Sequence, residues 1–125
     1  MDHRTYESER PCLCPAKPFL GERAVLDADE ARGLRALFQV LASDTRLRIL
    51  HALVVTPEMS PSEIATVLDM KSQAVSNQLQ RLVDKGILDS RRNGNQVHYR
   101  IVDPCVPQLL DYGLCLAEDA EGRRR

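Results

Sequence analysis

The sequence predicts a mainly α fold that carries one small β-hairpin (class α+β). Two observations lead to this prediction: apolar residues recur at helical spacings through most of residues 27–86, and residues 87–101 alternate like two strands around a turn. The 125 residues are enough for one domain with a single modest core. We expect a flexible N-terminal arm over residues 1–23, a folded domain over residues 24–120 and a disordered tail over residues 121–125.

The predicted arm contains two cysteines that are one residue apart. Pro11 and Pro15 bracket the stretch Cys12-Leu13-Cys14 and prevent a regular helix through it. Two thiols in an exposed arm have no core to pack into. They are therefore candidates for chemistry rather than for packing.

Two helices are expected to follow the arm. From Asp27 an apolar stripe runs along one helix face, and such a stripe near a chain end serves either as core or as dimer surface. The stripe consists of Ala31, Leu34, Leu37, Phe38 and Leu41. Asp44 is expected to cap the next helix, which ends near Thr56. The apolar positions of this second helix are Leu47, Leu50 and Leu53.

Residues 60–86 predict two short helices that are joined by a turn. Ser60 can cap the first of them, Pro61 suits its first position, and Glu63 completes a capping box. A turn at Asp69 leads into the second helix, which Gly86 is expected to close in a left-handed conformation. The apolar positions of the two helices are Ile64, Ala65, Leu68, Ala74, Val75, Leu79, Leu82 and Val83.

A hairpin and a last helix complete the expected domain. Two strands, at residues 87–91 and 97–101, flank Asn93-Gly94, a pair that is typical of hairpin turns. Asp103 then caps the last helix, with Pro104 at its first position. The apolar surface of this helix consists of Val106, Leu109, Leu110, Leu114 and Leu116. The order helix, turn, helix and hairpin is that of a winged helix-turn-helix.

The second helix of this unit has a polar face opposite its apolar face. A DNA major groove admits one α-helix, and its bases are read by polar side chains on the exposed helix face. Helices that are merely solvated also have such a face, but the arginine-bearing hairpin directly after it favours DNA binding. The expected DNA-contacting residues of the helix are Lys71, Ser72, Gln73, Ser76, Asn77, Gln78 and Arg81. Those of the hairpin are Arg91, Arg92, Asn95 and Gln96.

The net charge of −1 neither supports nor excludes a nucleic-acid partner. The distribution of charge favours one, because acidic residues gather at 22–30 and 118–121, away from the helix-turn-helix. No apolar run approaches the roughly 20 residues of a membrane span. The N-terminus also lacks the apolar region of a secretory signal. We therefore expect a cytoplasmic protein without a membrane partner.

Three stretches, residues 41–50 (LASDTRLRIL), 74–79 (AVSNQL) and 92–99 (RNGNQVHY), together resemble the ArsR/SmtB family of metal-responsive repressors. The resemblance implies a homodimer, formed through the first and last helices, that binds a palindromic operator in double-stranded DNA. It also implies that metal binding releases the operator. Asn77 stands where many members of the family have histidine, which leaves a polar residue at that position.

Members of this family place their metal sites at different positions, and two of the usual sites are not matched here. Ser60 stands where arsenic- and cadmium-type members have a cysteine at the start of the first helix of the helix-turn-helix. On the last helix, Asp103 matches one ligand of the zinc-type site, but Pro104 and Cys105 replace the histidines that follow. Neither type of site is therefore expected.

The remaining candidate metal ligands are Cys12 and Cys14 on the arm and Cys105 and Cys115 on the last helix. Thiolates select thiophilic ions. The two helix cysteines lie about 15 Å apart along the axis, so a second thiolate must come from the arm or from the other chain of a dimer. We rank Hg(II) first, because this placement of cysteines resembles the mercury-responsive members of the family. As(III) follows, and then Cd(II) or Pb(II).

Two alternatives remain open. Cys105 and Cys115 could be small buried core residues, as unpaired cysteines often are, and the chain would then be a constitutive DNA-binding module with inert cysteines. Alternatively, the same fold could be a repressor that senses oxidants or persulfides through its thiols. An enzyme is not expected, because the sequence contains no P-loop, no GxGxxG and no Ser/His/Asp grouping.

Overall fold

The computed structural model describes residues 17–123 and confirms the predicted winged helix-turn-helix. Cys12 and Cys14, most of the predicted arm and residues 124–125 of the predicted tail lie outside the described residues. In chain order the elements are the 3-10 turn η1 (Leu20–Glu22), α2 (Ala28–Leu41), α3 (Asp44–Val55), α4 (Pro61–Leu68), α5 (Ser72–Asp84), β1 (Leu88–Asn93), β2 (Gln96–Ile101) and α6 (Cys105–Arg123).

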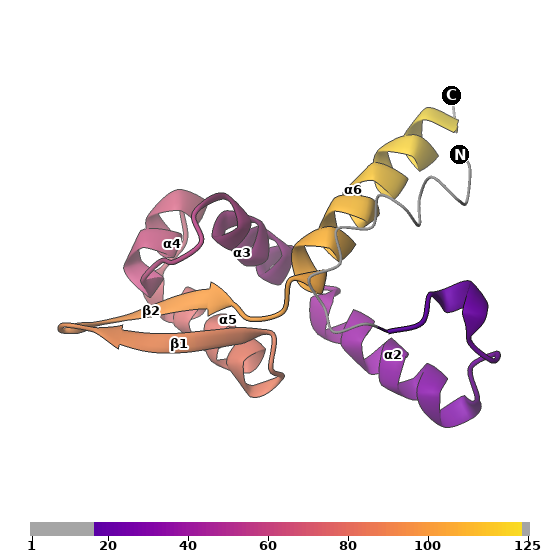
Figure 1. Ribbon diagram of the computed structural model, residues 1–125. Coiled ribbons are helices and arrows are strands. Elements are labelled where there is room, and N and C mark those ends of the chain that lie inside the picture. Colours follow the sequence, from indigo (N-terminus) through magenta and orange to yellow (C-terminus); the bar gives the residue numbers. More distant parts are fainter. Residues whose placement is uncertain (1–16, 124–125) are drawn as a thin grey trace.

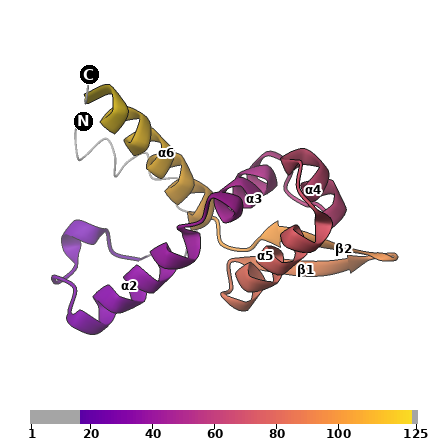
Figure 2. The same cartoon turned by 180° about the vertical axis from the view of Figure 1, so that it is seen from behind.

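Helices α3, α4 and α5 pack together with the hairpin into a compact head, and α2 and α6 project from one end of it (Figure 1; Figure 2). One apolar core fills the head, and α6 contacts the head through α3. The core residues that are almost fully buried are Ile49, Leu50, Leu53, Ile64, Val75, Leu79, Leu82 and Leu88.

Capping residues fix where the first helices begin. Asp27 caps α2 and Ser60 caps α4, each in a capping box with the glutamate three residues later. The prediction that Asp44 caps the next helix was wrong. Ser43 is the cap, because its side chain accepts the backbone N–H of Arg46, and Asp44 is the first helical residue. Both residue types are good caps, so the sequence alone did not separate them.

The connections on either side of α5 use left-handed backbone. Asp69 ends α4 at φ 54°, a conformation that aspartate tolerates better than most residues. Gly86 follows α5 at φ 76°, as predicted. These two turns set α5 against α4 on one side and lead directly into β1 on the other.

The hairpin, or wing, is antiparallel and pairs Leu88 with Ile101 at its base and Asn93 with Gln96 at its tip. Its two-residue loop is therefore Gly94-Asn95, one position later than the Asn-Gly signal suggests. Gly94 has φ 65°, which suits a turn with glycine at the first central position. Two backbone hydrogen bonds between Met59 and Tyr99, of 3.2 and 2.8 Å, tie the base of the wing to the loop before α4.

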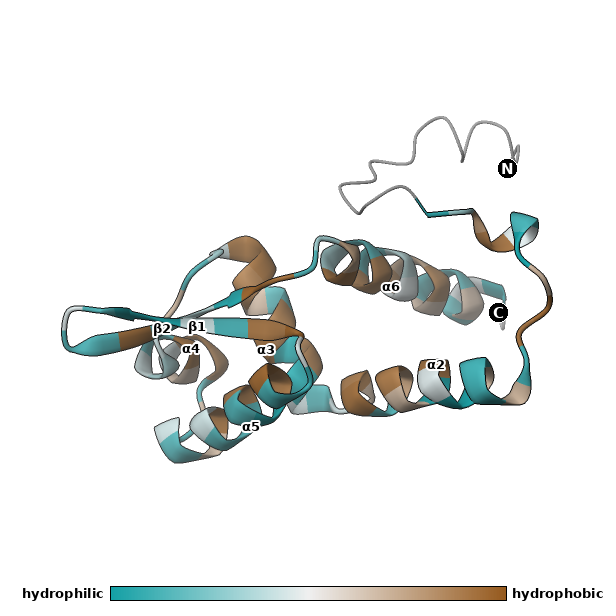
Figure 3. Cartoon of the chain, turned by 60° about the horizontal axis from the view of Figure 1, so that its bottom comes forward, coloured by the Kyte–Doolittle hydropathy of each residue, from teal (hydrophilic) through white to brown (hydrophobic). Residues whose placement is uncertain are grey.

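Outside the head, α2 and α6 leave most of their apolar side chains uncovered. Leu41 is the only buried residue of α2, and Val106 is the only buried residue of α6 in the part of the chain that is described. Phe38 is 47% exposed and Leu116 is 62% exposed. Brown, apolar segments run along both helices in Figure 3. Helix α6 continues to Arg123, beyond residue 120, where the folded domain was expected to end.

Within residues 17–123, no helix combines the length and the apolar character that crossing a membrane requires.

Candidate nucleic-acid interface

Helix α5 presents a polar face opposite the face that it buries in the head. Val75, Leu79 and Leu82 are buried in the core. Five of the predicted DNA-contacting residues are exposed, namely Lys71, Ser72, Gln73, Asn77 and Arg81, and two are half-buried, namely Ser76 and Gln78. The structure thus leaves all seven predicted residues of this segment at least partly accessible.

The start of α5 suits an anionic partner. Lys71 occupies the N-cap position and forms no side-chain cap, and the first turn has no acidic residue. The backbone N–H groups of that turn therefore face no competing carboxylate from their own helix and are available to a phosphate.

Two hydrogen bonds organise the amide side chains of α5. Gln73 Nε2 donates to Asn77 Oδ1 at 3.1 Å between two exposed side chains. Gln78 Oε1 accepts from Nε of Arg46, on α3, at 2.8 Å. The first bond joins two groups that solvent or DNA can separate, whereas the second anchors Gln78 to another helix.

The wing residues differ in how far they are already paired. Arg91 forms a salt bridge of 3.1 Å with Glu58, and Gln96 lies 3.3 Å from a ring nitrogen of His98. Arg92 and Asn95 are exposed near the tip. The wing therefore offers Arg92 more readily than Arg91 to a phosphate, although the sequence treated the two alike.

Sequence reasoning missed two residues of this surface. Ala74 was counted among the apolar positions, but it is exposed between the polar residues of α5, where a methyl group can contact the methyl group of thymine. Helical spacing from Asn77 and Gln78 was a signal that could have placed it there. Arg46 gave no such signal, because it lies 32 residues from its partner Gln78.

The two described cysteines lie on α6, outside this surface. Cys105 is the first residue of the helix and is disulfide-bonded, and its backbone N–H donates to Asp103 Oδ1 at 2.8 Å. Cys115 is exposed and carries a free thiol, which lies 3.8 Å from Asp119 Oδ2. Within the described ranges, no group of three or more His, Cys, Asp or Glu residues is close enough to hold a metal ion.

The surroundings of the two cysteines are different. Cys105 lines a cavity of about 460 Å³, together with Leu37 of α2, Ile87 after α5 and Val106 of α6. The negative charge of Asp119 raises the pKa of the Cys115 thiol, with smaller contributions from burial and from Glu118 and Asp111. Cys115 is therefore less ionised than an isolated cysteine, and an ion that binds its sulfur must displace a proton.

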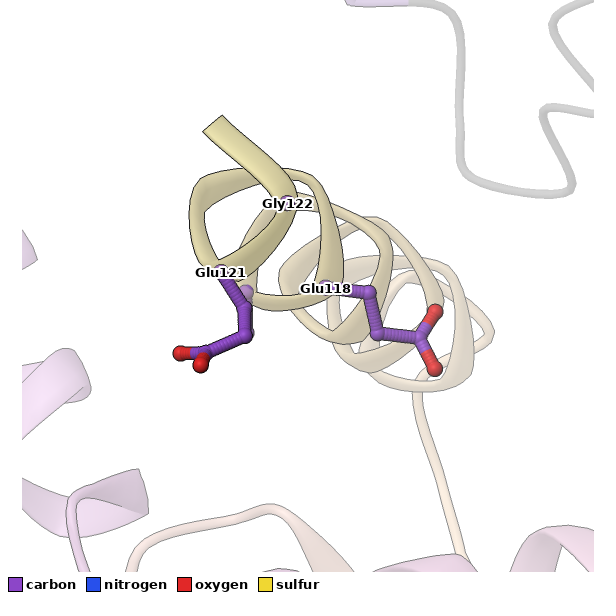
Figure 4. A pocket seen from close by; sticks show the side chains of 4 residues that line it. Glu118, Glu121 and Gly122 are labelled. Carbon is purple, nitrogen blue, oxygen red and sulfur yellow. The ribbon is translucent and has the colours of Figure 1, made fainter. Parts of the chain in front are cut away.

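The far end of α6 is acidic but does not form a joint site. A shallow hollow there is lined by Ala117, Glu118, Glu121 and Gly122. In Figure 4 the carboxylates of Glu118 and Glu121 point away from one another. These two groups are therefore not arranged to share a cation.

Comparison with known proteins gives the family of this chain. A helix-turn-helix domain family matches residues 41–91. The cadmium resistance transcriptional regulatory protein CadC of Listeria innocua is 32% identical over 82 residues, which are 66% of this chain and 69% of that protein. The crystal structure of the AntR antimony-specific transcriptional repressor superposes with a TM-score of 0.73 at 52% identity, and covers 87% of this chain and 98% of that chain.

The chain belongs to the ArsR/SmtB family. Members of this family are DNA-binding transcriptional repressors and not enzymes. A probable mercury resistance operon repressor of Streptomyces lividans is also similar, at 34% identity over 82 residues, which are 66% of this chain and 65% of that protein.

Proposed function

We propose that this ArsR/SmtB repressor binds its operator as a homodimer and is released when cysteine thiolates bind a thiophilic metal or metalloid ion. The observation that carries the proposal is the exposed polar face of α5 beside an arginine-bearing wing, in a chain whose described cysteines lie on a separate helix. DNA reading and ion binding then occupy different elements, as a switch requires.

The homodimer is supported by the uncovered apolar faces of α2 and α6. Soluble monomers rarely leave contiguous apolar surfaces open. A twofold pairing of these helices would cover them and would leave both copies of α5 exposed. The dimer would then place its two recognition helices in successive major grooves of one palindrome, about 34 Å apart.

For the inducer we place trivalent antimony and arsenic ahead of Hg(II), with Cd(II) and Pb(II) behind. The reason is that the antimony-specific repressor is 52% identical to this chain, whereas the mercury resistance repressor is 34% identical. All of these ions prefer thiolate sulfur. The proposed ligands are Cys12, Cys14, Cys105 and Cys115, of which two or three would bind one ion. Cys105 can serve as a ligand only after its disulfide has been reduced.

The test is an operator-release experiment on the full-length protein. Duplexes that bind the protein are selected from random DNA, and release is then measured against Sb(III), As(III), Hg(II), Cd(II), Pb(II) and Zn(II). Each Cys→Ser variant that removes a ligand should keep its operator affinity and lose release by the ion. His51→Gln, at an exposed position of α3, is the matched control and should keep both. Release that survives in a variant with all four cysteines changed to serine would refute the ion-sensing part of the proposal.

A thiol redox or persulfide sensor is the second candidate, and the disulfide at Cys105 favours it. In that case, oxidation of the thiols by peroxide or polysulfide should change operator affinity in the absence of any metal ion. Operator binding that is equal for the fully reduced and the oxidised protein would exclude this candidate. Mass spectrometry of the same samples would identify the modified cysteines.

A further inference from the structure

We propose that Arg46 fixes Gln78 as a hydrogen-bond donor, so that Gln78 selects guanine rather than adenine in the operator. The inference rests on the proposed function, because it requires that α5 reads operator bases. It concerns specificity, and it assigns Arg46 as a positioning residue that does not itself need to touch a base.

Two hydrogen bonds to different elements hold the Arg46 guanidinium in place. Its Nε donates to Gln78 Oε1 at 2.8 Å, and its Nη1 donates to the backbone carbonyl of Val40 at 2.9 Å. Val40 lies in the last turn of α2, where carbonyl groups lack helical partners. Arg46 and Gln78 are both half-buried, so solvent competes only partly for these bonds. The guanidinium therefore cannot turn away without losing both partners.

The chemistry of the guanidinium decides the orientation of the Gln78 amide. Arginine has five N–H donors and no acceptor. The amide oxygen of Gln78 must therefore face Arg46, and this removes the usual ambiguity between the oxygen and the nitrogen of a glutamine side chain. The amide nitrogen, with its two hydrogens, is left as the group that Gln78 presents to DNA.

A glutamine that presents only donors reads a different base from a free glutamine. Recognition of adenine uses the amide oxygen and nitrogen together, because adenine presents an N6 amino donor beside its N7 acceptor. Here the oxygen is shared with a cation, whose positive charge repels the amino hydrogens of adenine. Guanine presents two neighbouring acceptors, N7 and O6, and is the only base whose major-groove edge offers this pair. Guanine is therefore the expected partner of Gln78.

The experiment measures binding of the full-length protein to its selected operator and to duplexes in which each base pair is changed in turn. Gln78→Ala should abolish the base preference at one base pair of each half-site, and that base should be guanine. Replacement of that guanine by adenine, or by 7-deazaguanine, should weaken wild-type binding about 5- to 150-fold, the range for a good bidentate contact. Gln73→Ala, at a neighbouring exposed position, is the matched control and should leave this base pair unaffected.

Arg46 is tested through the same panel of duplexes. Arg46→Met should release the Gln78 amide and shift the preference at that base pair from guanine towards adenine. Arg46→Lys keeps the charge but lacks the planar fork, so it should give the same shift in a smaller degree. Urea unfolding and binding to non-specific DNA show whether either variant keeps its fold. A preference for guanine that is unchanged in both folded Arg46 variants would overturn the inference, as would adenine at the Gln78 position of the wild-type operator.

These outcomes separate the inference from the proposed function. If the wild-type protein selects no DNA sequence, the proposed function fails. If it selects an operator whose bases do not respond to Gln78→Ala, only the role of Gln78 and Arg46 fails.

Discussion

Ser60 stabilises the start of α4, the position at which the resemblance to arsenic- and cadmium-type repressors would place a cysteine. It is 2% exposed, and its hydroxyl accepts the backbone N–H of Glu63 at 3.2 Å. Ser60→Ala should lower the free energy of unfolding by about 1 kcal/mol, the usual cost of losing a helix cap. Urea unfolding measures this change. Ser90→Ala, at an exposed position of β1, is the control and should change stability by less than about 0.5 kcal/mol.

Glu63 makes part of this stabilisation dependent on pH. Hydrogen bonds from the backbone and the side chain of Ser60, with a smaller contribution from the charge of His98, lower the pKa of Glu63 below its ordinary value of 4.5. A lowered folded-state pKa means that the stabilisation is complete above pH 4.5 and is lost as the pH falls through the folded-state value. Glu63→Gln should therefore show a weaker loss of stability between neutral and acidic pH than the wild type. If the stability of the two proteins fell equally between neutral and acidic pH, Glu63 would not be the source of this pH dependence.

At the scale of the element, two neighbouring arginines of the wing that look alike in the sequence differ in their ion pairing in the structure. Both arginines are exposed, but Arg91 forms a salt bridge with Glu58 and Arg92 forms none within residues 17–123. Arg92→Ala should weaken operator binding and reduce the slope of log affinity against log salt by about 0.9, the value for one lost phosphate contact. Arg91→Ala should change this slope less. Fluorescence anisotropy at several salt concentrations measures the slope for each variant. A larger change in slope for Arg91→Ala than for Arg92→Ala would refute the prediction.

The elements themselves could be predicted because local chemistry determines them. The capping boxes at Asp27 and Ser60, the glycine after α5 and the hairpin all depend on residues that are close in sequence. The contacts that were missed join distant residues. The Arg46–Gln78 bond depends on how α3 crosses α5, and the Met59–Tyr99 pairing depends on where the wing folds back. The spacing of apolar residues in the sequence does not reveal how α3 crosses α5 or where the wing folds back.

The same limit applies to the candidate site. The exposed polar residues of α5, which are the candidate DNA contacts, follow from helical spacing and from the position of the buried residues. The ion ligands do not, because Cys105 and Cys115 lie too far apart on one helix to share an ion, and any common site depends on a second chain or on residues 1–16. The assignment of Cys12, Cys14, Cys105 and Cys115 as ion ligands therefore remains a prediction.

At the scale of the whole molecule, the exposed apolar faces of α2 and α6 predict that the chain functions as a dimer. Phe38 is 47% exposed and belongs to no part of the buried core of the head. Phe38→Asp should therefore leave the head folded, convert the dimer to a monomer and weaken operator binding by at least about 100-fold, since two half-sites are no longer bound together. Analytical ultracentrifugation, circular dichroism and anisotropy measure the three effects. Arg32→Asp, on the same helix but on the side opposite the apolar stripe, is the control for the added charge. A dimer that persists in Phe38→Asp would show that this face is not the interface.

Helix α6 contributes little to the core of the head, and this has a consequence for evolution. Beyond Val106 the described part of the helix has no buried residue, so a proposed ligand there, such as Cys115, can be exchanged by a single substitution at little cost in folding stability. Under the proposed function the operator is read by α5 and the wing, which such substitutions do not touch. A repressor built in this way can acquire a new inducer while it keeps the genes that it controls, provided that the apolar stripe that pairs the subunits is retained.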